Sequence, residues 1–207
     1  MHHLSLRLPH VRRTERLPTG ARRTLARCLS GASAVEFAMV APLVILTIVE
    51  FMQIGLYFYE TFRLGQATSS ATRQIQVGSV ANTAASASDF KTQFLCPLLG
   101  GAMSCTDVTV SIQTVPLGTA PNGFYAYVLP DQSDIIRVKT DGSQTPYCPG
   151  QPGSYVYVQV AYAMPVFSPA WKLLASLRNG NSIRFLNASS VFRNEPYASG
   201  SQPQASC

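Results

Sequence analysis

Hydrophobic residues are concentrated in one long run near the start of the chain, at residues 37–58. A helix of about 22 residues is roughly 33 Å long, which is enough to cross the hydrocarbon core of a bilayer. Further apolar residues continue at near-helical spacing beyond this run: Phe62, Ala67, Ala71 and Ile75. The pattern therefore predicts one membrane-spanning helix that continues out of the membrane and ends near Gly78.

The second half of the chain alternates between apolar and polar residues, which is typical of half-buried β-strands. Three segments show this alternation: residues 107–115, 155–163 and 183–191. Two weaker segments, 124–129 and 135–140, are expected at the edges of the sheet. Because segments rich in proline and glycine separate these runs, an antiparallel sheet joined by loops is predicted.

Two short helices are expected to pack on this sheet. The first covers residues 89–99 and has Asp89 as its N-cap. The second, residues 170–177, is amphipathic. Its apolar residues, which would lie on the sheet, are Trp171, Leu174 and Leu177. The predicted fold class is α+β, with a long N-terminal transmembrane helix extending into a small antiparallel β-sheet domain with short packed helices.

The net positive charge of the chain is confined to its beginning. The whole chain has a net charge of +6, and residues 1–31 contain seven arginines against one glutamate. The remaining charges cancel, so the rest of the chain has no support for nucleic-acid binding. Because cytoplasmic flanks of membrane helices are rich in Lys and Arg, the basic block predicts a cytoplasmic N-terminus. We expect three parts: a basic leader at 1–31, the helix at 32–78 and an exported domain at 79–207.

Histidine occurs only at His2, His3 and His10, all within this basic block. The Ser-His-Asp and Cys-His arrangements are therefore unavailable to the remainder of the chain, and a zinc site would need scattered cysteines and carboxylates. No carboxylate pair stands out by spacing, and no glycine loop suited to phosphate is present. We expect neither an enzyme nor a metal or cofactor site.

Four of the five cysteines follow the predicted membrane helix, whereas Cys28 lies in the leader. An even number of cysteines in an exported domain indicates disulfides, with three possible pairings. The short separation favours Cys96 with Cys105, which leaves Cys148 with Cys207. The chain has no CxxC spacing, so a structural role is expected rather than a redox or metal-binding one.

Two glutamates, Glu36 and Glu50, lie at the start of the apolar run and within it. A charged side chain near bilayer depth costs on the order of 2.5 to 3.5 kcal/mol, so each is expected to have a partner. They are about 40° apart around a helix and share a face with polar residues, which predicts a seam that contacts protein. The alternative for Glu50 is that it reaches the far interface. Pro42, between them, is expected to kink or loosen the helix, unless it is incidental.

Several short motifs occur in one register along this helix and near the end of the chain. They are Ala34-Val-Glu-Phe-Ala38, Pro42, Val49-Glu-Phe51, Gly55, Ala71-Thr-Arg73 and the segment 188–196. With a glutamate fifth after Gly31, they resemble type IV pilins and, more closely, the TadE-like family of Flp/Tad pilus assembly pseudopilins. The resemblance covers mainly residues 31–78 and implies a pilin-like fold.

The resemblance implies that a prepilin peptidase cleaves between Gly31 and Ala32. The new amine of Ala32 would lie one helical turn from Glu36, on its own helix or on a neighbour. Four residues would contact pilin and other pseudopilin subunits: Glu36, Phe37, Pro42 and Glu50. The implied function is that of a minor pseudopilin in assembly of a Flp/Tad-type IV pilus for surface attachment. It would be anchored once in the bacterial inner membrane, with a periplasmic domain, or enter the extracellular pilus.

Three alternatives stay open from the sequence. The chain could be an uncleaved single-pass protein whose exported domain binds a ligand or a surface. It could be released as a soluble protein after the small residues at 84–87. An exported enzyme is disfavoured by the lack of histidine. The identity of the mature N-terminus separates the first alternative from a pseudopilin, and turnover by the purified domain would indicate an enzyme.

Overall fold

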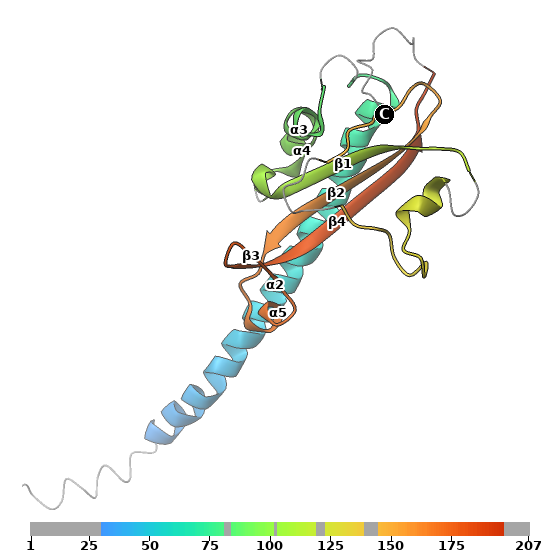
Figure 1. The fold of residues 1–207 in the computed structure, drawn as a ribbon. Helices are drawn as coiled ribbons and strands as arrows, with labels where there is room; N and C mark the ends of the chain where they lie inside the picture. The colour runs from blue at the N-terminus through green and yellow to red at the C-terminus, as the bar shows by residue number, and fades with distance from the viewer. Residues whose placement is uncertain (1–29, 81–83, 102, 119–122, 139–144, 197–207) are drawn as a thin grey trace, which may run out of the picture. The chain divides into compact units, whose positions relative to one another are not determined.

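The fold is α+β, as predicted: a long apolar N-terminal helix followed by a small antiparallel sheet with short helices (Figure 1). The computed structural model describes residues 30–80, 84–101, 103–118, 123–138 and 145–196. The predicted leader, except for its last two residues, and Cys207 lie outside these ranges. The chain divides into two units, Met1–Thr47 and Ile48–Cys207.

Helix α2 (Ser30–Gln76) combines the predicted apolar run and its extension in one element, with Pro42 inside it. The helix ends as predicted, next to Gly78. This glycine has φ +77°, a left-handed conformation that other residues rarely adopt. Its N–H donates to the Ile75 carbonyl, and Ser79 N donates to the Gln74 carbonyl, which satisfies the last turn.

The sheet has four antiparallel strands in the order β1-β2-β4-β3. Their bounds are β1 Val108–Val115, β2 Tyr155–Pro165, β3 Ser176–Arg178 and β4 Asn181–Arg193. The three predicted main strands are confirmed. The predicted edge strand at 124–129 is wrong, because this segment contains a 3-10 helix, Gly123–Tyr127. Of the segment 135–140, the described part forms only an isolated bridge between Val128 and Ile135.

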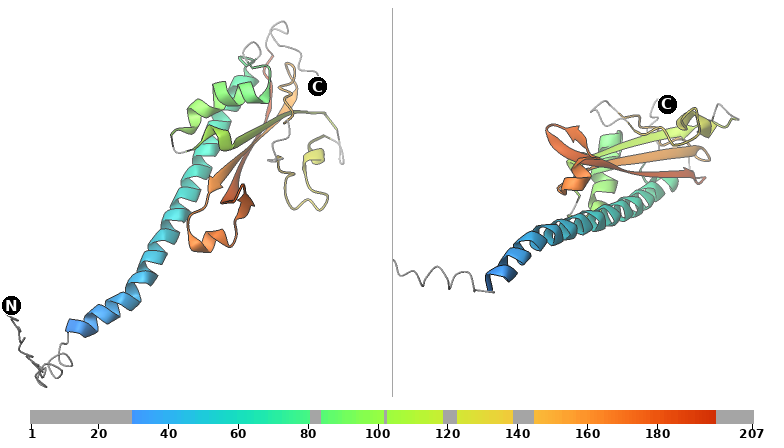
Figure 2. Two further views of the ribbon diagram at one scale, coloured as in Figure 1. Left: turned by 60° about the vertical axis from the view of Figure 1, so that its left-hand side comes forward. Right: turned by 90° about the horizontal axis from the view of Figure 1, so that it is seen from below.

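One face of the sheet and the C-terminal half of α2 enclose the core of the second unit. Alternate residues of the strands are buried, including Ile112 of β1 and Val158 of β2, and they share a cluster with Leu64, Ala71 and Ile75 of α2. Figure 2 shows the strands lying beside this half of the helix. Each buried aliphatic side chain of this kind stabilises the fold by roughly 1.5 to 3 kcal/mol relative to an exposed one.

A short helical segment covers the predicted range 89–99 and begins slightly earlier. It consists of α3 (Ala87–Phe90), a π turn (Lys91–Leu95) and α4 (Cys96–Leu99). Its N-cap is Ser86, whose Oγ accepts a hydrogen bond from Asp89 N at 3.1 Å. The prediction of Asp89 as N-cap is therefore wrong. Asp89 lies in the first turn instead, where its carboxylate accepts the Ser86 hydroxyl at 2.8 Å and the N–H of Ala85 at 3.3 Å.

Helix α5 (Pro169–Lys172) is shorter than the helix predicted at 170–177. Trp171 packs against the core, whereas Leu174 and Leu177 are exposed, so the predicted placement of these two leucines on the sheet is wrong. The reason is a two-residue turn between β3 and β4, in which Asn179 and Gly180 both have positive φ. Such an Asn-Gly turn favours a hairpin, which ends the helical stretch early.

Candidate assembly surface of the long helix

The residues of the predicted processing site and first assembly contacts lie at the start of α2. Gly31 and Ala32 are in its first turn. Glu36 and Phe37 follow on the next turn and are exposed within the first unit. Cleavage between Gly31 and Ala32, and the contacts of Glu36, Phe37 and Pro42 with other subunits, stay predictions.

Glu50 is hydrogen-bonded to its own chain through both carboxylate oxygens. Oε2 accepts the Ser168 hydroxyl at 2.8 Å, and Oε1 accepts the backbone N–H of Ala170 at 3.0 Å. The Ser168 hydroxyl also accepts the N–H of Trp171 and thus caps α5. No local sequence pattern predicts these partners, because they are 118 and 120 positions away along the chain. A direct role of Glu50 in contacts with other subunits stays a proposal.

Gln53 continues this attachment one turn further along α2. Its side chain is completely buried, and its Oε1 accepts the backbone N–H groups of Phe167 at 3.0 Å and Ser168 at 3.4 Å. Glu50 and Gln53, three positions apart, therefore face the same segment; we refer to them as the helix clamp. The clamp fixes residues 167–170 against α2. The signal that could have revealed it is a glutamine within an otherwise apolar run.

An aromatic contact extends the same face of α2. The Tyr57 ring lies 5.1 Å from the Trp171 ring, and the Arg184 guanidinium lies over the Trp171 ring at 5.3 Å. Thr61 donates its hydroxyl to the Tyr57 carbonyl at 2.7 Å, and Thr47 donates to the Leu43 carbonyl at 2.8 Å. These threonines therefore need no acceptor from another subunit. In the second unit, the predicted polar face of the helix turns toward its own domain.

The opposite face of α2 is apolar and exposed within the second unit. We call it the outer face: Phe51, Met52, Leu56, Phe58, Tyr59 and Phe62. One turn beyond Phe62 the exposed positions on this side become small or polar: Gly65, Gln66, Ser69, Ser70 and Arg73. The change is abrupt, although the helix continues without a break to Gln76.

Glu60 is the third acidic residue of α2 and is only 7% exposed. No hydrogen-bond partner for its Oε2 atom is found among the residues that the structure describes. The inward position follows from its place seven residues after the buried Gln53, close to two helical turns. The sequence analysis assigned Glu60 no role.

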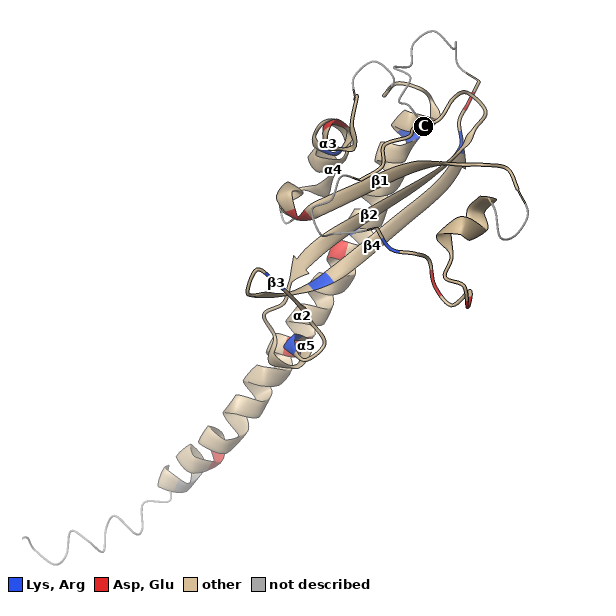
Figure 3. Cartoon of the chain, in the orientation of Figure 1, with Lys and Arg blue, Asp and Glu red and all other residues tan. Residues whose placement is uncertain are grey.

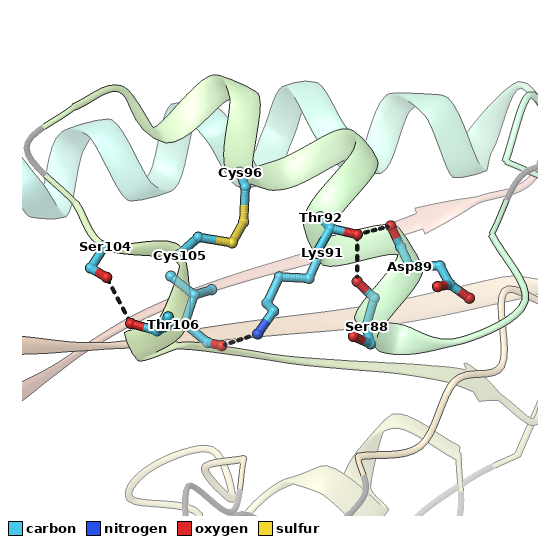
Figure 4. The surroundings of a disulfide bond; sticks show 9 residues. Ser88, Asp89, Lys91, Thr92, Cys96, Ser104, Cys105 and Thr106 are labelled. Atoms are coloured by element: carbon cyan, nitrogen blue, oxygen red, sulfur yellow. Dashed lines mark hydrogen bonds between the residues drawn. A yellow bond between two sulfur atoms is a disulfide. The ribbon is translucent and has the colours of Figure 1, made fainter.

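The Cys96–Cys105 disulfide is present and joins α4 to the 3-10 turn that leads into β1, with a Cα–Cα distance of 5.6 Å. Figure 4 shows it beside Lys91, whose Nζ donates to the Val108 carbonyl at 3.3 Å. Two links, one covalent and one polar, thus hold the helical segment to β1. Cys148 is also disulfide-bonded. Its predicted partner Cys207 lies outside the described residues, so that pairing stays a prediction.

The arrangement offers contact surfaces rather than a chemical centre. Within the described ranges, no group of three or more His, Cys, Asp or Glu side chains could hold a metal ion. The polar groups with the most specific geometry, those of the helix clamp, bind backbone and hydroxyl groups of the same chain. The outer face is apolar, and no residue of the described part of the second unit covers it.

Residues 31–73 match the family model of TadE-like proteins. This is the family that the motifs along the helix resemble. The matched segment lies within α2 and contains Glu36, Pro42 and the helix clamp, while the sheet lies outside it. No curated protein and no solved structure matches the chain.

Proposed function

We propose that this chain, with its TadE-like segment, is a minor pseudopilin that takes part in assembling a Flp/Tad-type pilus. The family match indicates a function associated with Tad pili, with pilus components as partners. Among the described residues, α2 is long and apolar enough to cross a membrane, which is compatible with a single-pass anchor. The specific role in assembly is our inference from the outer face.

The length of the exposed apolar surface is the observation that carries the proposal. Exposed large apolar side chains occur along α2 from Val35 to Phe62. In a helix this distance is roughly 40 Å, whereas the hydrocarbon core of a bilayer is about 30 Å thick. Around a helix that does not tilt strongly, lipid can therefore cover only part of it. An excess of about 10 Å needs another apolar partner.

The position of the outer face favours a protein partner for this excess. The sheet already covers the other side of the helix from Leu64 onward, and the helix clamp holds α5 on that same side. Phe58, Tyr59 and Phe62 are aromatic, the class of side chain that contributes most to protein interfaces. We infer that the helices of neighbouring pilus subunits cover them.

Anchoring and processing follow the same proposal. A prepilin peptidase would cleave between Gly31 and Ala32, and the new amine would pair with Glu36. The basic leader would keep the N-terminus in the cytoplasm, so the sheet domain would be periplasmic. The Cys96–Cys105 disulfide supports this location, because disulfides persist in oxidising compartments. The TadE-like pilus family is not enzymatic, and we propose no catalytic activity for this chain.

Two exposed positions on one side of α2 provide a matched test of the outer face. Phe62 is apolar, and Gln66, one turn later, is polar and also exposed. Phe62→Arg should reduce crosslinking of the full chain to pilin subunits about tenfold or more, as when an aromatic hot spot is lost. Gln66→Arg adds the same side chain where the face is already polar and should crosslink like the wild type. If both variants crosslinked equally to pilin subunits, the outer face would not be an assembly surface.

Processing is tested separately at the start of the helix. Gly31→Leu should leave the leader attached, as read from the N-terminus of membrane-extracted protein by mass spectrometry. Glu36→Gln should be inserted and cleaved but should lose association with pilin, because the amine of Ala32 would lack its counter-charge. An intact leader on most of the wild-type membrane protein would favour the uncleaved single-pass alternative.

A further inference from the structure

A group of large apolar side chains is exposed around α5 and β3. Leu173, Leu174 and Leu177 are 87%, 72% and 80% exposed, and Phe167 just before α5 is 46% exposed. We call these four residues the leucine patch. Leucines in such numbers at one place usually mark a contact with a protein or a membrane, since single exposed apolar residues are ordinary but groups are not.

The helix clamp fixes where this patch lies along α2. Glu50 accepts the N–H of Ala170, and Gln53 accepts the N–H of Phe167. The patch therefore begins at the level of these two residues. Both residues lie near the start of the second unit, which begins at Ile48.

When the span is counted from Ser33, where the candidate membrane helix begins, the clamp lies one bilayer thickness further along α2. From Ser33 to Gln53 is about 20 residues, or roughly 30 Å of helix, which equals the thickness of the hydrocarbon core. This step rests on the membrane anchor of the proposed function. With the helix spanning the membrane, α5 and its neighbours lie at the boundary between acyl chains and headgroups.

The charges beside the patch fit an anionic lipid surface. Between Pro165 and Leu186 the chain has three basic residues, Lys172, Arg178 and Arg184, and no acidic one. Figure 3 shows the basic segments at α5, β3 and the adjoining end of β4. Two acidic side chains face this segment: Asp107, which lines a hollow with Lys172 and Arg178, and Glu50, which is bound to Ser168 and Ala170. Trp171 lies among these groups, and tryptophan is enriched at membrane interfaces.

We infer that the leucine patch is a second membrane contact, which rests on the surface of an anionic phospholipid bilayer. Leu173, Leu174 and Leu177 enter the boundary between headgroups and acyl chains, and Lys172 and Arg178 contact lipid phosphates. Interfacial elements of this chemistry bury their apolar side about 5 to 10 Å into that boundary. The contact holds the sheet domain down on the membrane from which its helix emerges.

Trp171 is the sole tryptophan of the chain, so its fluorescence reports on this place without an added label. The full chain is reconstituted in nanodiscs containing phosphatidylglycerol, with lipids brominated either near the headgroup or near the chain end. Bromine near the headgroup should lower Trp171 emission on the order of twofold, and deep bromine much less, as expected for an interfacial position. Iodide in the water should quench it weakly.

Substitutions of exposed leucines provide the matched comparison. Leu173→Asp combined with Leu177→Asp should abolish quenching by headgroup bromine and should increase quenching by iodide. Leu117→Asp is the control, because Leu117 is also 87% exposed but follows β1 at the opposite end of the sheet, where Val115 pairs with Tyr155. It should leave both kinds of quenching at the wild-type level.

Two results would overturn the inference. In the first, the wild-type chain resists alkaline extraction, which shows that it is anchored. Its Trp171 is nevertheless quenched by iodide and not by any brominated lipid. The other is unchanged lipid quenching in the double variant. If lipid does not quench and the same substitutions instead abolish crosslinking to pilin, the patch binds another subunit. Release of the wild-type chain by alkaline extraction would refute the anchor, and with it the proposed function as well.

Discussion

The hydroxyl of Ser168 donates a hydrogen bond to Glu50 Oε2 at 2.8 Å, although the two residues are 118 positions apart. The same hydroxyl accepts the N–H of Trp171 at 3.3 Å. The serine is thus an N-cap whose own hydrogen is bound by a carboxylate from α2. An acidic side chain of the long helix therefore holds the N-cap of a four-residue helix in place.

Removing either partner should loosen α5 from the long helix. Ser168→Ala removes both the cap and the donor to Glu50, so the free energy of unfolding should fall by about 1 to 2 kcal/mol. Glu50→Ala should have an effect that is not additive with it, with a coupling of about 0.5 kcal/mol or more. The measurement is denaturant unfolding of the full chain in detergent, followed by Trp171 fluorescence. Thr47→Ala is the control, because the Thr47 hydroxyl donates only to a carbonyl of its own helix. Additive effects of Ser168→Ala and Glu50→Ala would contradict the coupling.

Loss of the Cys96–Cys105 link should weaken the attachment of the helical segment to β1. The disulfide closes a short loop, with a sequence separation of 9. Replacing both cysteines with serine should lower the free energy of unfolding by about 2 to 3 kcal/mol. Lys91→Met removes the weaker polar link to the Val108 carbonyl and should lower the free energy of unfolding by less than this. The two variants are compared by unfolding without reductant, and an unchanged stability of the cysteine variant would show that the loop is held by packing alone.

The stability of the sheet domain should fall at high pH through Tyr147. Its hydroxyl donates to the Ala84 carbonyl at 2.9 Å, and burial, with a smaller contribution from Asp89, raises its pKa to about 12. A pKa above the value of 10.0 for an unperturbed tyrosine means that the folded state holds the proton more tightly. The resulting stability is fully present below pH 10 and is lost between about pH 10 and 12.

Unfolding of Tyr147→Phe and of the wild type, measured from pH 8 to 11.5, checks this dependence. The phenylalanine variant should be less stable at pH 8 by about 1 kcal/mol, because the Ala84 carbonyl loses its donor. The difference between the two proteins should shrink as the pH rises above 10. Tyr125→Phe, at an exposed position, should follow the wild-type curve. A constant difference at all pH values would contradict the prediction.

Glu60→Gln should stabilise the protein. The carboxylate is almost fully buried, and its Oε2 atom lacks a hydrogen-bond partner in the described part of the chain. A buried charge without a partner opposes folding, so a neutral side chain of the same size should raise the free energy of unfolding by about 1 kcal/mol or more. Glu195→Gln, at an exposed position, should change little. A lower melting temperature for Glu60→Gln would indicate that the charge has an unrecognised partner.

Much of the fold could be predicted from local patterns. The period of two at 107–115, 155–163 and 183–191 predicted β1, β2 and β4, and the apolar run predicted α2. The errors have local causes too. Asn179-Gly180 is a hairpin signal within the stretch where the helical pattern was followed, and it produced β3 in place of a longer α5. Ser86 is a better N-cap than Asp89 because its hydroxyl reaches the N–H three residues on.

The candidate surfaces were only partly predictable. The glutamates in the apolar run predicted a polar face that contacts protein, but they did not indicate that in the second unit this protein is the chain's own domain. Gln53 and Glu60 mark the side of α2 that meets the domain, and both are buried only because the folded domain covers that side. The partners of Glu50 come from a segment far along the chain, and no local pattern relates them. The leucine patch arises from the early end of α5, which the sequence analysis did not foresee.

The core described above also determines the order in which an exported chain can fold. The inner face of α2, with Leu64, Ala71 and Ile75, is covered by strands from the far end of the sequence. The last of these strands is followed by a hydrogen bond from Glu195 N to the Gln76 carbonyl, which closes the domain on the end of its first helix. Contacts between such distant segments form slowly and late. In an exported chain, as we propose, this face of α2 would stay uncovered until β4 had crossed the membrane, so the domain would complete its folding only after translocation.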